Sequence, residues 1–201
     1  MRPFSLLAGA FLALVVLPAL AQEGTPTRIR GTVETLDGQT LVVKSRENQE
    51  LSITLAEDLQ VSAVTKADLS DIKAGDYIGS AAVKGTDGKL HAQEVLIFPE
   101  AARGTGEGHR PWDLTPDSTM TNATVAEVVD VAEGRLLKLK YQGGENEIEV
   151  PPEAPVVTLA PGDRSLLQPG TAVFIPATKA EDGSLAASRV IAGKDGVQPP
   201  M

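Results

Sequence analysis

The stretch GTVETLDGQTLVVK (residues 31–44) decides the fold of the first half of the chain, and ATVAEVVDVAEGRLLK (residues 123–138) repeats its pattern in the second half. In each stretch two β-rich runs meet at an acidic residue followed by glycine, Asp37-Gly38 or Glu133-Gly134. This pattern is typical of a β-hairpin, because the turn needs a residue that tolerates positive φ. Each half therefore begins with a predicted hairpin.

The repeat continues beyond the hairpins. A third β-rich segment follows at residues 51–55 and 147–150, and then a short irregular or helical piece ends at Gly75 or Gly170. In the first copy Thr65 is the candidate cap of that piece. Two further strands, joined by a second Asp-Gly turn, complete each copy. These turns are Asp87-Gly88 and Asp182-Gly183.

Three strands, a short helix or turn and a final hairpin make the element order of an OB-like barrel, with an SH3-like barrel as the alternative. We therefore predict an all-β protein of two tandem five-stranded barrels, at residues 28–98 and 122–192. A spacer (22–27), a Gly/Pro-rich strap between the copies (99–121) and a flexible tail (193–201) complete the predicted organisation.

The order of these motifs resembles a bacterial family of exported domains of unknown function, which are predicted to form small OB-like barrels. In the first copy the resemblance rests on Gly-Thr-Val at 31–33, Leu-Val-Val at 41–43, Gly-Asp at 75–76 and Asp-Gly-Lys-Leu at 87–90. It covers both copies. Because these motifs are turn glycines and core aliphatics, the resemblance implies a fold and no catalytic residues.

The N-terminus has the features of a secretory signal peptide (residues 1–21). Arg2 is followed by an apolar run, and Ala19 and Ala21 provide the small residues that a signal peptidase requires, so we expect cleavage before Gln22. The apolar run is at the short limit for a membrane span, and an uncleaved anchor is the alternative. The predicted location is the periplasm or the exterior, with no stable membrane insertion after cleavage.

Charge and composition exclude several function classes. The formal net charge of −9 disfavours nucleic acid as a partner, and the scarcity of aromatic residues leaves no stacking platform for bases. The chain has no cysteine, which excludes disulfides and thiolate sites. Phosphate-binding and nucleophile motifs are absent, and His91 and His109 are the only histidines. We therefore predict a non-enzymatic protein without a cofactor.

The strap contains the single tryptophan of the chain, Trp112, which a solvated linker rarely needs. We predict that Trp112 and Leu114 fill an interface between the barrels, since a tryptophan buries a large apolar area. The alternative is a site for monovalent copper formed by His109, Trp112 and Met120, whose residue types suit a soft ion.

These observations favour an exported interaction or scaffolding protein of the envelope, which contacts another envelope or periplasmic protein through the strap and the seam. Copper handling is the alternative function. The identity of the partner and the oligomeric state stay open at this stage.

Overall fold

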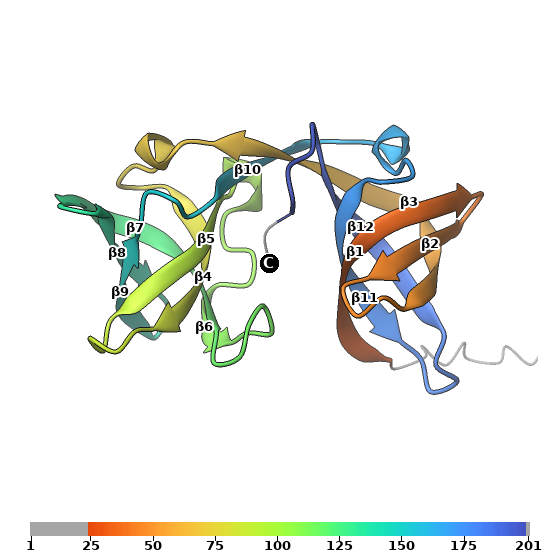
Figure 1. Cartoon of the computed structure of the whole chain (residues 1–201), viewed down its shortest axis with the longest axis horizontal. Coiled ribbons are helices and arrows are strands. Elements are labelled where there is room, and N and C mark those ends of the chain that lie inside the picture. Colours follow the sequence, from red (N-terminus) through yellow and green to blue (C-terminus); the bar gives the residue numbers. More distant parts are fainter. Residues whose placement is uncertain (1–23, 200–201) are drawn as a thin grey trace, which may run out of the picture.

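The computed structural model describes residues 24–199, so the predicted signal peptide lies outside the described residues. Within this range the chain forms β-strands joined by turns and short 3-10 segments (Figure 1), and the prediction of an all-β protein is confirmed. Between residues 24 and 199 we find no helix that is long and apolar enough to span a membrane.

Five strands close into a ring, which we call ring 1. They are β1 (Thr25–Asp37), β2 (Thr40–Ser45), β3 (Glu50–Ala67), β12 (Leu185–Gly193) and β11 (Ala172–Lys179). Each strand pairs with the next in this order, and β11 pairs with β1 to close the ring. β12 runs parallel to β3, whereas the other pairs are antiparallel.

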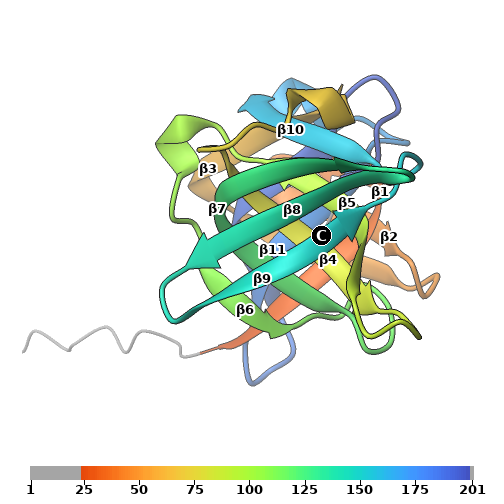
Figure 2. The same cartoon turned by 90° about the vertical axis from the view of Figure 1, so that its left-hand side faces the viewer.

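Five other strands close into ring 2. They are β4 (Tyr77–Lys84), β7 (Thr119–Val131), β8 (Gly134–Tyr141), β9 (Gly144–Val150) and β5 (Leu90–Ile97). Figure 2 shows β7, β8 and β9 side by side on the face of this ring. β5 closes the ring by pairing with β4 on one side and, over a short parallel register, with β9 on the other. The short strand β6 (Gly108–Pro111) pairs with the beginning of β7.

Each ring takes strands from both halves of the sequence. Ring 1 combines the first three strands of the first copy with the last two strands of the second copy, and ring 2 has the reverse composition. The prediction that residues 28–98 and 122–192 each close a barrel of their own is therefore wrong. The exchanged strands meet at equivalent positions in the two rings. In ring 1 Val33 N donates to Thr171 O at 2.8 Å, and in ring 2 the equivalent Val125 N donates to Asp76 O at 2.8 Å.

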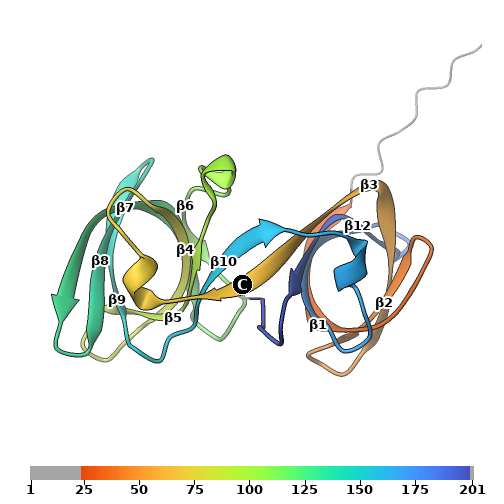
Figure 3. The same ribbon diagram turned by 90° about the horizontal axis from the view of Figure 1, so that it is seen from above.

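The length of β3 accounts for the exchange. β3 continues for 18 residues, and residues 55–67 contain neither glycine nor proline, the residues that most readily turn a chain. β3 therefore extends from ring 1 toward ring 2, where the chain continues into β4. β10 (Val156–Pro161) crosses between the rings in the opposite direction (Figure 3). The two strands pair antiparallel between the rings, from Ser62 opposite Pro161 to Ala67 opposite Val156.

Short 3-10 segments follow both crossing strands, η1 (Leu69–Asp71) after β3 and η3 (Arg164–Leu166) after β10. Thr65, the predicted helix cap, lies within β3, because pairing with β10 holds the chain extended as far as Ala67. Asp68 takes its place before η1, and its backbone N–H donates to the Asp71 carboxylate at 2.8 Å.

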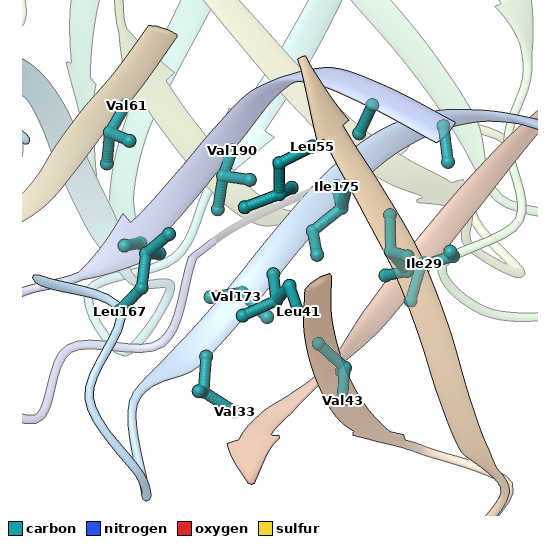
Figure 4. Close-up of a cluster of buried hydrophobic side chains, with 14 residues drawn as sticks. Ile29, Val33, Leu41, Val43, Leu55, Val61, Leu167, Val173, Ile175 and Val190 are labelled. Atoms are coloured by element: carbon teal, nitrogen blue, oxygen red, sulfur yellow. The ribbon is translucent and has the colours of Figure 1, made fainter. Parts of the chain in front are cut away.

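The buried side chains form three clusters that follow the exchange. The cluster inside ring 1 joins Ile29, Val33 and Leu41 of the first copy to Val173 and Ile175 of the second (Figure 4). A second cluster fills ring 2. The third cluster lies between the rings and contains Val64, Tyr77, Leu96, Phe98, Val157, Phe174 and Ile191. Each ring is therefore packed as well as paired by both copies.

Both predicted ends of the mature chain differ from the structure. The predicted spacer reaches residue 27, but β1 begins at Thr25, which lies opposite Lys179. The predicted flexible tail begins at residue 193, but Lys194 N donates to Val64 O at 3.0 Å and Val197 packs against the cluster between the rings. The described part of the tail is therefore held by β3 and by the cluster between the rings.

The exchange predicts which engineered cysteine pair forms a disulfide. Thr32 lies opposite Ala172 in the β1–β11 register. The adjacent pair carries the hydrogen bond from Val33 to Thr171, so Thr32 and Ala172 form a non-hydrogen-bonded pair with the closer Cα approach. We expect Thr32→Cys combined with Ala172→Cys to form an intrachain disulfide, measured by mass spectrometry of the monomer.

The control pair is Thr124→Cys with Ala172→Cys. Thr124 lies opposite Tyr77 in ring 2, whereas a barrel closed by the second copy alone would place Thr124 opposite Ala172. This pair should stay reduced in the monomer. Oxidation of the control pair, with the first pair reduced, would contradict the exchange.

Candidate functional site

The strap between the copies folds back onto the seam between the rings. After η2 (Glu100–Ala102) the chain forms β6 and then a tight turn, in which Trp112 N donates to Ser118 O at 2.8 Å. The Trp112 side chain is half-buried and packs against the cluster between the rings. Backbone pairing thus presents the tryptophan to the seam.

Arginines from ring 1 and from the strap lie close to the Trp112 ring. The guanidinium of Arg28, in β1, lies 4.0 Å from the ring centroid, and that of Arg110, in β6, lies 5.4 Å away. Stacking a guanidinium on an indole is a favourable cation–π contact. Trp112 Nε1 is buried and has no hydrogen-bond partner among the described residues, so the ring acts mainly through its faces.

Asp113 ties the strap to ring 1. Arg30 Nη2 donates to Asp113 Oδ1 at 2.8 Å, and Arg28 lies 3.5 Å from the other carboxylate oxygen. Burial acts to raise the pKa of Asp113, but the hydrogen bond from Arg30 and the charges of both arginines outweigh it and lower the pKa below its ordinary value. The next residue, Leu114, is half-buried, and its carbonyl oxygen accepts from Arg46 Nη1 at 3.4 Å.

The structure does not bring the predicted copper ligands together. His109 lies opposite Thr121 in the β6–β7 register, whereas Met120 lies opposite Arg110, so the side chains of His109 and Met120 point to opposite faces of this ribbon. His109 Nδ1 contacts Thr121 Oγ1 at 2.8 Å, and Met120 is fully buried. A copper ion bound by these residues together with Trp112 is incompatible with this register.

A groove of about 540 Å³ lies along the seam between the rings. Its walls come from η2, β6 and β7 on the side of ring 2 and from β11 and β12 on the side of ring 1, with β3 and β10 between them. Apolar side chains dominate the lining, chiefly Phe98, Ala101, Leu159, Phe174 and Ile191.

The charged residues of the groove are both arginines, Arg110 and Arg189, and no acidic residue lines it. Neither arginine has a carboxylate within ion-pair distance in residues 24–199. Burial, and then the nearby charge of Arg28, lower the pKa of Arg110. The groove therefore holds positive charge without a counter-ion, in a chain whose net charge is −9.

One wall of the groove is an open strand edge. The parallel pairing of β10 with β5 ends at Thr158 opposite Ile97, and beyond it Phe98 N donates to Tyr77 O. Gly162 N donates to Val61 O, so by the alternation of an antiparallel ladder the N–H and C=O of Leu159 face away from β3. On that side the parallel ladder with β5 uses the N–H of Leu159, which donates to Ile97 O, so the backbone group of Leu159 that stays open toward the groove is its C=O.

Sequence reasoning singled out Trp112, which packs against the cluster between the rings, and missed the groove; that Leu114 fills the same interface stays a prediction. Because the chain has few aromatic residues, each of them is a candidate for a special position, and this is the signal that could have indicated the groove. Between residues 24 and 199 the aromatic side chains are those of Tyr77, Phe98, Trp112, Phe174 and Tyr141, and Tyr141 alone lies outside the cluster between the rings.

Comparison of the chain with known protein families, curated proteins and solved structures gives no match. The function proposed below is therefore inferred from the chemistry of the groove.

The half-buried position of Trp112 predicts a measurable loss on truncation. We expect Trp112→Ala to lower the free energy of unfolding by about 2 kcal/mol, less than for a fully buried tryptophan, measured by thermal unfolding. Trp112→Phe should cost less, because Nε1 has no partner to lose. An unchanged melting temperature for Trp112→Ala would contradict a role of the strap in the seam.

The lowered pKa of Asp113 predicts a pH-dependent contribution to stability. Because the pKa is lower in the folded state, the contribution is complete above about pH 4, the unfolded pKa, and is lost as the pH falls through the folded pKa. We expect Asp113→Asn to lower the melting temperature at pH 7 by about 1–3 °C, as for a partly exposed ion pair.

This difference from the unmodified protein should shrink at pH 3 and below. The control is Glu133→Gln, at an exposed glutamate with no ion pair among the described residues, which should behave as the unmodified protein at both pH values. An Asp113→Asn effect that is equally large at low pH would contradict a role for the carboxylate charge.

Proposed function

We propose that this chain is a non-enzymatic, exported interaction protein of the cell envelope, and that its seam groove binds an extended acidic segment of a partner protein. Export rests on the predicted signal peptide at residues 1–21. In this proposal each ring is an OB-like barrel whose last two strands come from the other copy, and the two barrels act as a rigid scaffold for the groove.

The observation that carries the proposal is the charge of the groove. Arg110 and Arg189 line an apolar groove that contains no carboxylate, although acidic residues outnumber basic ones in the chain. A partly desolvated guanidinium binds a carboxylate more strongly than an exposed one does, since screening by water is reduced. Arg110, which is partly buried, therefore favours an anionic ligand, and the exposed Arg189 adds a second positive charge beside the apolar surface of Phe98 and Phe174.

The open edge of β10 favours a peptide over a lipid-like amphiphile. An extended peptide can donate a backbone N–H to the C=O of Leu159, while its alternate side chains reach the apolar floor and the arginines. An amphiphile with an alkyl chain would leave this carbonyl group unpaired. The groove therefore fits a segment in which apolar and acidic residues alternate.

The test uses a fluorescein-labelled nonapeptide in which leucine and glutamate alternate, with fluorescence anisotropy as the measurement. We expect saturable binding that weakens with added salt, and no binding of the matched peptide with lysine in place of glutamate. Arg189→Gln, at an exposed arginine, should weaken binding about tenfold, the loss expected for a charged hydrogen bond. Methylation of alternate peptide nitrogens should abolish binding.

The control is Lys44→Gln, which removes one positive charge at an exposed position outside the groove and should leave the affinity unchanged. A separate titration uses dodecanoate. Binding of dodecanoate in the groove, with no binding of the acidic peptide, would replace the peptide proposal by an amphiphile. Binding of the peptide that is insensitive to both Arg189→Gln and N-methylation would exclude this groove as the site.

A further inference from the structure

Three metal-ligating side chains meet on the outer surface of ring 2, remote in the chain from the strap. Asp87 lies in the turn between β4 and β5, His91 in β5 and Glu149 in β9. One ligand atom from each residue lies within 4.8 Å of the others. The exchange of strands creates this cluster, since Asp87 and His91 come from the first copy and Glu149 from the second.

The two carboxylates approach different nitrogens of the imidazole. His91 Nε2 is 3.0 Å from Asp87 Oδ2, and His91 Nδ1 is 3.7 Å from Glu149 Oε2. Because one ion binds one nitrogen of the ring, an ion held by Nε2 and Asp87 requires the Glu149 side chain to rotate toward it, which the spacing of the three ligand atoms, within 4.8 Å of one another, allows. Two ligands of a tetrahedral zinc ion, each about 2.0–2.1 Å from the metal, lie about 3.3 Å apart. The spacing of Nε2 and Oδ2 is close to this value, so the hairpin already presents one edge of such a coordination site.

Gly85 provides the space that the cluster occupies. A Cβ atom at this position would lie 2.7 Å from Asp87 Oδ1 and 2.8 Å from His91 Nε2. Gly85 is not among the glycines with positive φ, so its backbone conformation does not demand glycine. A side chain at this position would instead prevent the close approach of Asp87 and His91.

The cluster lies where ring 2 is most weakly closed. The β5–β9 register consists of Leu90 opposite Ile148 and His91 opposite Glu149, and it is much shorter than the other registers of the ring. Lys89 forms an ion pair with Glu149 across the same junction. A cation at this junction therefore already links the hairpin to β9, and a metal ion would do so with more ligands.

We propose that Asp87, His91 and Glu149 form a binding site for a divalent transition-metal ion such as Zn²⁺, which joins β5 to β9 and stabilises ring 2. One imidazole nitrogen and two carboxylate oxygens are ligands that zinc accepts, and the exposed side of the cluster leaves room for a water molecule as the fourth ligand. The ion displaces the Lys89 ammonium group from Glu149. The site is independent of the proposed peptide groove.

The test is isothermal titration calorimetry of the purified full chain, free of affinity histidines, with zinc chloride at pH 7. We expect one zinc ion per chain and a rise in melting temperature of about 5 °C at a hundredfold excess over the dissociation constant. His91→Gln should abolish both effects. His109→Gln is the matched control, since His109 is the only other histidine, and it should leave both effects unchanged.

Two further variants test the geometry rather than the mere presence of a histidine. Lys89→Gln removes the cation that competes for Glu149, and it should tighten zinc binding about two- to fivefold. Gly85→Ala should weaken binding, because the added methyl group separates Asp87 from His91. The proposal is overturned if zinc fails to bind, if binding survives His91→Gln, or if Lys89→Gln weakens it.

Discussion

Backbone pairing between β3 and β10 joins the two rings into one structure. The residues from Ser62 to Ala67 pair with those from Val156 to Pro161, and the chain passes between the rings along these two strands. Without this crossing, each ring would lack two of its five strands and would expose unpaired strand edges, which are prone to intermolecular association. Each ring of this structure therefore depends on both halves of the sequence.

The seam follows from the crossing. Because both crossing strands pass between the rings, the apolar side chains there must be covered by residues from both copies, and all aromatic residues of the described chain except Tyr141 gather at this place. The strap covers part of the seam with Trp112, while the groove leaves another part open. Arg110 belongs to both, since its guanidinium lies 5.4 Å from the Trp112 ring centroid and also lines the groove. The stability of the strap and the charge of the groove are thus coupled through one side chain.

The strands and their turns could be predicted from neighbouring residues in the sequence. The pairing of strands between the two copies depends on residues far apart in the sequence and could not. The hairpins could be predicted because their turns depend on adjacent residues, and Gly38 and Gly134 do have φ values of +55° and +107°. The exchange could not be predicted from the repeat, since equivalent strands of the two copies carry the same pattern and either could complete a ring. The absence of glycine and proline from residues 55–67 allows β3 to cross, but β10 crosses as well although prolines flank it, so local sequence does not decide between the two pairings. Arg189 and Leu159 were missed for the same reason, because only the exchange brings them to one groove.

The two copies do not produce two equivalent grooves, and the reason lies in their crossing strands. From Ser62 to Val64, β3 pairs with β12 on one side and with β10 on the other, so both of its edges are satisfied. β10 pairs with β3 along its whole length but with β5 only as far as Thr158. Prolines precede β10 and end it, whereas β3 contains none, so β10 is the shorter crossing strand. The open carbonyl group of Leu159 therefore arises from sequence differences between the copies, and it lies in the same groove as the two arginines that lack a counter-ion. A duplicated fold with exchanged strands thereby gains a single, asymmetric binding surface that neither copy has alone.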